Sequence, residues 1–139
     1  MEKIIFDLDG VLASDKTTRH LVECAKPDYA AFNNACGNEK PNPVTVKMAQ
    51  QFYRIGYEVR VHTARSIKVY KKTREWLHKN GLDFVFLVMR PDWNTQPAAE
   101  LKAYMAKVAR PVLIFENDAA CIKEYKKLGL SVVKTYFGK

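Results

Sequence analysis

The stretch IIFDLDGVLA, residues 4–13, decides how the chain is expected to fold. Three apolar residues run directly into Asp7, and Asp9 follows after one further residue, with Gly10 behind it. Two carboxylates this close raise each other's proton affinity, so a simple turn has no need of the pair. The stretch therefore predicts a buried strand that ends at a chemical site.

Apolar runs and helical patterns alternate along the rest of the chain. Five strands are predicted over residues 3–6, 57–62, 84–88, 112–115 and 130–136, and four helices over 43–55, 66–79, 97–108 and 118–129. Apolar residues at helical spacing are expected to face the core, namely Val44, Met48, Phe52, Ile55, Ile67, Tyr70, Trp76, Leu77, Leu101, Met105 and Val108. This alternation predicts an α/β fold with a parallel sheet and helices on both faces.

The length of 139 residues predicts one domain, 1–139. Residues 13–41 stand outside the strand–helix alternation, and a stretch this long is expected to be functional or to contain a short helix. Hydrophobic content of 47% and charged content of 27% are those of an ordinary globular protein. The apolar run near the N-terminus is too short for a signal peptide, and no stretch approaches the ~18 apolar residues of a membrane span.

Charge and cysteine content bear on partners and compartment. The net charge of +8 favours a polyanionic partner such as nucleic acid, because phosphate contacts give sequence-independent affinity. Lysines that only keep the surface soluble remain the alternative. The cysteines Cys24, Cys36 and Cys121 are odd in number and lack zinc-site spacing, which favours a reducing cytoplasm.

Polar residues collect where the predicted strands end. In an open parallel sheet, ligands bind beyond the carboxyl ends of the strands. Those ends hold Asp7, Asp9, Thr63, Arg65, Arg90, Glu116, Asn117 and Asp118. The acids suit Mg²⁺, and the hydroxyl and the arginines suit a phosphate. The pattern therefore predicts a metal-assisted phosphate site at this edge.

The spacing of the first two acids suits phosphoryl transfer. Residues two apart on a strand point to the same side, so both carboxylates are expected to face one space. One carboxylate can attack phosphorus and form an aspartyl phosphate. The other can protonate the leaving group and later activate water.

The motif FDLDGV resembles the first motif of the haloacid dehalogenase-like phosphatases, DxD followed by Gly and Thr or Val. The resemblance implies a Rossmann-like three-layer α/β/α sandwich with a minimal cap at 13–41, a requirement for Mg²⁺ and a phospho-aspartate intermediate. It implies Asp7 as the nucleophile and Asp9 as the general acid/base, with Gly10 in the phosphate-binding turn. Thr63 then corresponds to the phosphate-binding hydroxyl and Lys102 to the charge-balancing lysine.

The acidic fourth motif of that superfamily corresponds to residues 116–118. The resemblance implies Asp7, Asp9 and Asp118 as metal ligands, with Glu116 or Asn117 as secondary candidates. Asn117 stands where the family usually has an aspartate, and alanines occupy the place of an acid expected shortly before Lys102.

Three further stretches, HTAR, LVMR and LIFENDAACIKEYKKLGL, resemble the 3′-phosphatase domain of polynucleotide kinase-phosphatases and small phage relatives. This resemblance implies removal of 3′-phosphates from DNA or RNA ends, with Arg65, Arg90 and Arg19 as phosphate-binding residues. The kinase motif GxxxxGK[ST] is absent from the sequence. A phosphatase of nucleoside monophosphates or other small molecules, and a catalytically silent binding module, remain as alternatives.

Some residues have two interpretations. His62 is expected to pack, His20 and His78 to lie at the surface, and Cys121 to lie in the core. The cluster Lys68, Lys71, Lys72 and Arg74 predicts a solvated helix face or a surface that steers a nucleic-acid backbone. The aromatic residues Tyr29, Phe32 and Trp93 can stack on a base, although packing is favoured.

Overall fold

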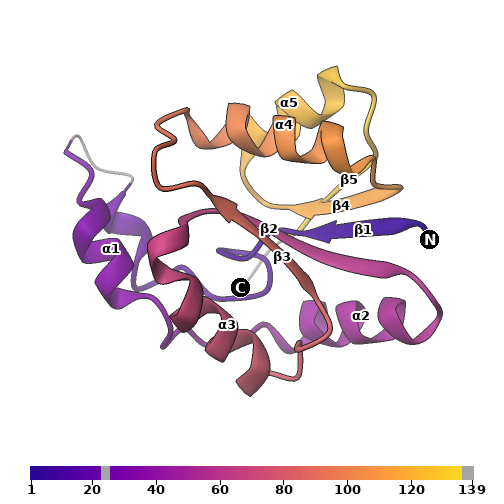
Figure 1. Ribbon diagram of the computed structural model, residues 1–139, viewed down its shortest axis with the longest axis horizontal. Helices are drawn as coiled ribbons and strands as arrows, with labels where there is room; N and C mark the ends of the chain where they lie inside the picture. The colour runs from indigo at the N-terminus through magenta and orange to yellow at the C-terminus, as the bar shows by residue number, and fades with distance from the viewer. Residues whose placement is uncertain (23–25, 136–139) are drawn as a thin grey trace.

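The computed structural model describes residues 1–22 and 26–135 and contains a five-stranded parallel sheet in the order β3-β2-β1-β4-β5 (Figure 1). The strands are β1 (Lys3–Phe6), β2 (Glu58–Ser66), β3 (Phe86–Arg90), β4 (Leu113–Glu116) and β5 (Val132–Lys134). In the registers Phe6 lies opposite Val61 of β2 and Phe115 of β4. The predicted α/β fold class with a parallel sheet is confirmed.

Helices cover both faces of the sheet, as Figure 1 shows. On one side lie α2 (Pro43–Arg54) and α3 (Tyr70–Lys79), and on the other lie α4 (Ala98–Ala109) and α5 (Ala119–Lys127). The insertion contains α1 (Tyr29–Ala35) and a 3-10 turn, η1 (Arg19–Leu21), so it has a short helix of its own. A second 3-10 turn, η2 (Ile67–Val69), precedes α3. The three-layer sandwich is therefore confirmed, whereas one domain over 1–139 stays a prediction.

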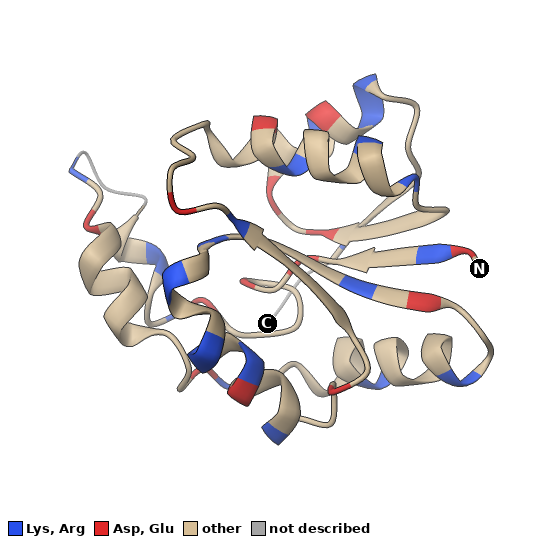
Figure 2. Cartoon of the chain, in the orientation of Figure 1, with Lys and Arg blue, Asp and Glu red and all other residues tan. Residues whose placement is uncertain are grey.

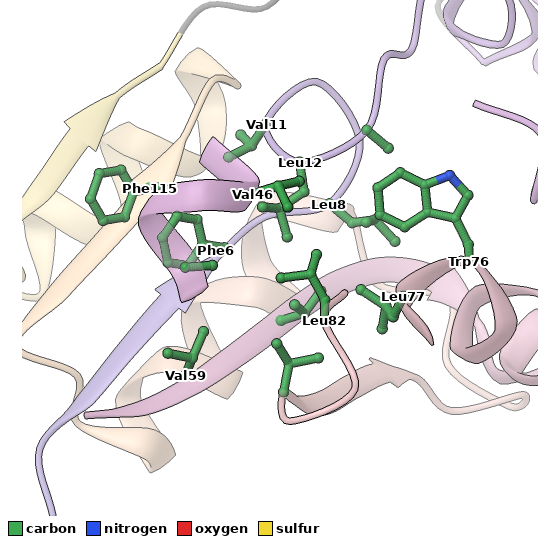
Figure 3. Packing of buried hydrophobic residues seen from close by; sticks show 14 of the residues in the cluster. Phe6, Leu8, Val11, Leu12, Val46, Val59, Trp76, Leu77, Leu82 and Phe115 are labelled. Atoms are coloured by element: carbon green, nitrogen blue, oxygen red, sulfur yellow. The ribbon is translucent and has the colours of Figure 1, made fainter. Parts of the chain in front are cut away.

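The central strand β1 is buried on both sides. Ile4 and Phe6 face the cluster that α2 and α3 cover, and Figure 3 shows Phe6 beside Phe115 in this cluster. The rings of Phe6 and Phe115 stack with centroids 4.5 Å apart. Ile5 faces the opposite cluster, where it packs with residues of α4 and α5. Burial on both faces explains why the strand is a continuous apolar run.

Some predicted core positions are wrong. The exposed residues among them are Val44, Ile55, Ile67, Tyr70 and Val108. In α2 the buried residues are instead Thr45, Val46 and Ala49. The Thr45 hydroxyl donates a hydrogen bond of 2.6 Å to the Val11 carbonyl, which fixes this face of α2 against the loop after β1.

Strand boundaries also differ from the prediction. The second strand continues through HTAR to Ser66, so Thr63 and Arg65 belong to β2 itself, and the third begins at Phe86. The predicted end of the fifth strand at Tyr136 lies outside the described residues, as does Cys24. Cys36 and Cys121 are buried free thiols, and Cys121 belongs to the core as predicted.

Within the described parts of the chain, none of the helices has the length and apolar character to span a bilayer.

Candidate active site

Lys102 joins two buried carboxylates at the carboxyl end of the sheet. Its ammonium lies 2.8 Å from Asp7 Oδ1 and also contacts Glu116 Oε1. Asp7 follows β1 directly and Glu116 is the last residue of β4, so the parallel pairing of these strands brings both acids to one edge. All three side chains are buried, so one cation serves two carboxylates with little access to water.

The pKa values in this cluster move in different directions. Burial, followed by the nearby charge of Glu116, raises the pKa of Asp7 well above its usual value, against the effect of Lys102. Burial acts to lower the pKa of Lys102, but Asp7 and Glu116 raise it well above its usual value. Burial acts to raise the pKa of Glu116, but the charge of Lys102 and hydrogen bonds lower that pKa below its usual value. Of the two acids, Asp7 therefore binds a proton more readily.

Arg65 holds Asp9 through a two-point ion pair. Its Nε donates to Asp9 Oδ2 at 3.0 Å and its Nη2 to Asp9 Oδ1 at 2.7 Å. The same Nη2 donates to Glu39 Oε1 at 2.8 Å, and Nη1 donates to Thr73 Oγ1 at 3.3 Å. Burial acts to lower the pKa of Arg65, but Asp9 and then Glu39 raise it above its usual value, so the guanidinium remains charged.

Protein groups surround the Arg65 guanidinium in this structure, and its predicted role in binding phosphate stays a prediction. The Arg65 side chain is 1% exposed, and each of its three guanidinium nitrogens donates to a protein group. A phosphate would have to displace those contacts. In this structure Arg65 fixes the orientation of the Asp9 carboxylate through two hydrogen bonds.

The two aspartates are not related by strand alternation. β1 ends at Phe6, and residues 8–13 form a tight loop in which the amides of Val11, Leu12 and Ala13 all donate to the Leu8 carbonyl. Asp7 contacts a lysine of α4, whereas Asp9 contacts an arginine of β2. The alternation argument that placed both carboxylates on one side therefore does not apply beyond Phe6.

Gly10 lies where only a glycine fits well. Its φ is +83°, a left-handed conformation that other residues rarely adopt. A Cβ at this position would lie 2.1 Å from Nδ2 of Asn117, so the loop after β1 packs directly against the loop after β4. Asn117, the departure from the acidic fourth motif, thus contacts the motif that carries both aspartates.

The donor groups suit magnesium in kind, but they do not form a complete cage. Among residues 1–22 and 26–135, no three side chains of His, Cys, Asp or Glu gather closely enough to hold a metal ion. Mg²⁺ commonly binds one or two carboxylates, with water and substrate phosphate as its other ligands, and Asp7 and Asp118 supply carboxylates of this kind at the ends of β1 and β4. Their role as metal ligands stays a prediction. Asp9 was predicted as a third ligand, but both of its oxygens accept from Arg65.

Asp118 and Glu116 have structural tasks as well. Asp118 is exposed and caps α5, since its Oδ2 accepts a hydrogen bond from the Cys121 amide at 2.9 Å. Glu116 is fully buried, and its Oε2 accepts from the amides of Asn117 and Asp118 at 3.0 Å and 3.4 Å. Both oxygens of Glu116 therefore accept from protein groups, whereas only one oxygen of Asp118 does, so Asp118 is the more available carboxylate for a metal ion.

The remaining predicted residues lie in different environments. Thr63 is buried in β2, and its hydroxyl accepts from the Arg65 amide at 3.1 Å. Arg90, at the end of β3, donates to the Ala64 carbonyl and, through Nη1, to Asn94 Oδ1 at 2.7 Å, so it braces the loop before α4. Arg19 is half-exposed in η1, and its Nε lies 3.8 Å from Asp15 Oδ2.

The histidines occupy the predicted places. His62 is fully buried, and burial followed by the charge of Arg60 lowers its pKa to about 3. Its Nε2 accepts a hydrogen bond from Arg60 Nε at 3.1 Å. His20 and His78 are exposed.

Two of the three loop aromatics are exposed, against the packing that the sequence favoured. Trp93 is 81% exposed and Tyr29 is 64% exposed. Figure 1 shows that α1, which begins at Tyr29, and the connection between β3 and α4, which contains Trp93, both lie at the end of the sheet toward which the strands point. Both aromatic side chains are therefore open to solvent, on segments that lie at the same end of the sheet as the site.

The sequence missed Glu39 and Thr73, which complete the surroundings of Arg65. Glu39 lies in an irregular loop and carries no motif. Thr73 has the helical spacing of a buried residue, but its neighbours on α3 are charged. The one available signal was Arg65 itself, because an arginine that follows a buried strand needs acceptors near it.

No family model matches the chain, and no curated protein matches its sequence. Solved structures do match. A chain in the Pnkp1/Rnl/Hen1 RNA repair complex aligns over 100% of this chain and 44% of its own length, with a TM-score of 0.76 and 17% identity. A haloacid dehalogenase-like family hydrolase from Streptococcus pneumoniae aligns over 99% of this chain and 86% of its own, with a TM-score of 0.62 and 10% identity.

The chain has the haloacid dehalogenase-like fold. A class C acid phosphatase from Bacillus anthracis, solved with tungstate bound, also matches over 97% of this chain and 66% of its own, with a TM-score of 0.66 and 10% identity. The chain spans less than half of the RNA repair protein that it matches. At these identities the likeness establishes the haloacid dehalogenase-like fold alone.

Proposed function

We propose that the chain is a phosphomonoesterase in which Asp7 is the nucleophile. The observation that carries this proposal is the pair of separately held carboxylates at the carboxyl edge of a haloacid dehalogenase-like sheet. Asp7 Oδ1 lies 2.8 Å from Lys102, and Asp9 is fixed by two hydrogen bonds from Arg65. Two acids with different partners suit two different tasks in one reaction.

The reaction follows from these positions. A carboxylate oxygen of Asp7 attacks phosphorus, and the bond from phosphorus to the ester oxygen breaks. Asp9 donates a proton to the departing oxygen, and then accepts one from the water that attacks the aspartyl phosphate. Cleavage of the bond between phosphorus and Asp7 releases inorganic phosphate and restores the carboxylate. Lys102 offsets negative charge at Asp7 throughout.

Magnesium is the cofactor that this site suits best. Asp7 and Asp118 would hold it, and it would neutralise charge on the phosphoryl oxygens. A divalent cation beside Asp7 favours the ionised carboxylate, which is the form that attacks phosphorus. This effect matters because burial raises the pKa of Asp7 and so disfavours the ionised carboxylate.

The substrate that we favour is a polynucleotide 3′-end of DNA or RNA. The net charge of +8 supports a polyanion, although Lys and Arg are spread over α3, α4 and α5 rather than gathered on one helix (Figure 2). The exposed rings of Trp93 and Tyr29 beside the site suit stacking on bases. The fold likeness to a chain of an RNA repair complex supports the same class.

The test compares wild type with Asp7→Asn on p-nitrophenyl phosphate, with and without Mg²⁺. Magnesium-dependent turnover by wild type that Asp7→Asn abolishes supports the phosphatase. Equal slow hydrolysis by both proteins would instead identify a silent binding module. A crystal structure with trifluoroberyllate and Mg²⁺ would then show whether a phosphoryl mimic binds Asp7.

A second comparison tests the substrate class. We expect a 3′-phosphorylated oligonucleotide to be hydrolysed with a higher kcat/KM than a 3′-mononucleotide, and the preference to fall as salt rises. Equal values for both, independent of salt, would favour the small-molecule phosphatase.

The odd number of cysteines favours a cytoplasmic enzyme.

A further inference from the structure

Glu39 lies at the end of the insertion, and its carboxylate and carbonyl connect three parts of the molecule. Its Oε1 accepts from Arg65 Nη2 at 2.8 Å, and its Oε2 accepts from the Gly37 amide at 2.9 Å. Its backbone carbonyl accepts from Trp76 Nε1 of α3 at 2.8 Å. The side chains of Glu39 and Arg65 are each 1% exposed, so this pair has little competition from water.

The loop around Glu39 is held in place on both sides. The Ser14 amide donates to the Lys40 carbonyl at 2.8 Å, and the Asn42 amide donates to the Leu12 carbonyl at 2.8 Å. These bonds tie the loop to the segment that follows Asp9. Glu39 therefore has a fixed position from which to hold Arg65.

The guanidinium of Arg65 has a geometry that needs this support. Its Nε and Nη2 both donate to Asp9, Nη2 also donates to Glu39, and Nη1 donates to Thr73. A planar guanidinium with a partner at each nitrogen has one orientation. Asp9 is the group to be held, so only Glu39 and Thr73 tie the Arg65–Asp9 pair to the rest of the protein. Without Glu39, the single hydrogen bond of 3.3 Å to Thr73 would remain, and Arg65 could turn together with Asp9.

We propose that Glu39 is a positioning residue that acts through Arg65 to orient Asp9 for proton transfer to the leaving group. The inference rests on the proposed function, because Asp9 has a leaving group to protonate only if the chain is a phosphomonoesterase. Glu39 contacts Arg65, Gly37 and Trp76, none of which is a reacting group in the proposed reaction. Its effect is therefore on the step that needs a proton.

The test uses two substrates that differ in their leaving group. Phenyl phosphate releases a basic phenolate, whose departure needs a proton, whereas p-nitrophenolate leaves without one. For Glu39→Gln we expect kcat/KM for phenyl phosphate to fall about tenfold or more, within the range of acid–base groups, and kcat/KM for p-nitrophenyl phosphate to fall much less. We compare kcat/KM because hydrolysis of the aspartyl phosphate, in which Asp9 also acts, is common to both esters and does not enter this ratio. Glutamine has one acceptor oxygen, so it cannot serve both Arg65 and the Gly37 amide.

Two further variants keep the test decisive. Thr73→Val removes a smaller part of the support for Arg65, and it should give the same leaving-group dependence to a lesser degree even if Glu39→Gln does not fold. Asn94→Ala is the matched control, since Asn94 holds a different arginine, Arg90, at the same edge. It should change both substrates by the same factor.

The outcomes separate the two proposals. If wild type and Asp7→Asn hydrolyse both esters equally slowly, the proposed function is wrong. If wild type is active and Asp7→Asn is not, but Glu39→Gln and Thr73→Val slow both esters by one factor, the positioning role alone is overturned. A change confined to kcat, with kcat/KM unaltered for both esters, would overturn it too, because proton donation to the leaving group precedes hydrolysis of the aspartyl phosphate.

Discussion

Replacement of Lys102 by methionine removes the only cation that Asp7 and Glu116 share within the described cluster. The Lys102 ammonium lies 2.8 Å from Asp7 Oδ1 and also contacts Glu116, and the three side chains are 4%, 10% and 0% exposed. Methionine keeps much of the length of the side chain but leaves two buried carboxylates without a counter-ion. Loss of one partner from a buried ion pair costs about 3–5 kcal/mol.

We expect Lys102→Met to fold, because a domain of this size is commonly stable by about 5–15 kcal/mol. Its melting temperature should fall by roughly 10–20 °C, since each kcal/mol corresponds to several degrees. Urea denaturation followed by circular dichroism at pH 7.5 gives the free energy of unfolding. Lys107→Met, an exposed lysine on the same helix, is the matched control and should change stability by no more than about 0.5 kcal/mol.

The pH dependence gives a sharper check. In Lys102→Met the folded carboxylates have pKa values above those of the unfolded chain, so the folded state binds more protons. Its stability relative to wild type should therefore rise as the pH falls from 8 to 5. Adding Glu116→Gln should recover part of the loss at pH 7.5, because one uncompensated charge is removed. Lys102→Met as stable as Lys107→Met at every pH would refute the buried ion pair.

Three other predictions concern different parts of the molecule. Gly10→Ala should lower the free energy of unfolding by about 1–2 kcal/mol through its left-handed φ and by about 1–3 kcal/mol through the contact with Asn117. Urea denaturation of the double variant with Asn117→Ala should show recovery of the second contribution only. His62, whose pKa is lowered to about 3, should destabilise the fold as the pH falls below about 6.5, by ~1.4 kcal/mol per pH unit. The difference in unfolding free energy between wild type and His62→Gln should follow that slope from pH 6 to 4, and a constant difference would contradict it. Trp93→Ala should lower kcat/KM for a 3′-phosphorylated single strand by about 5–150-fold, more than for p-nitrophenyl phosphate, while Tyr104→Ala, which removes an exposed aromatic on α4, should not. Equal effects of the two variants would argue against stacking at Trp93.

The sheet could be predicted because each strand carries its own signal. The run from Lys3 to Phe6 is apolar throughout, as a strand buried on both faces requires, and the structure places it at the centre. The core faces of the helices were less predictable. Val44 has a large apolar side chain but lies at the surface, because Thr45 bonds to the loop after β1 and turns the helix. A specific tertiary hydrogen bond of this kind has no trace in the periodicity.

The candidate site was predictable to the extent that strand ends meet at one edge. Asp7, Lys102 and Glu116 come together as the topology requires. Arg65 differs, because its contacts depend on Glu39 in a loop without a motif and on Thr73 in the next helix. Its charge suggested phosphate binding, which stays a prediction, and the structure pairs the buried guanidinium with Asp9. Burial of a side chain depends on the whole packing, which a short motif does not contain.

Asp7 and Asp9 have counter-ions from different layers of the sandwich, a helix for Asp7 and the sheet for Asp9. Lys102 comes to Asp7 from α4, whereas Arg65 comes to Asp9 while it rests on Thr73 of α3. A substitution that retunes one acid can therefore leave the other undisturbed, although a single residue separates them in the chain. In the proposed reaction, the nucleophilicity of Asp7 and proton delivery by Asp9 can therefore be altered separately by substitution.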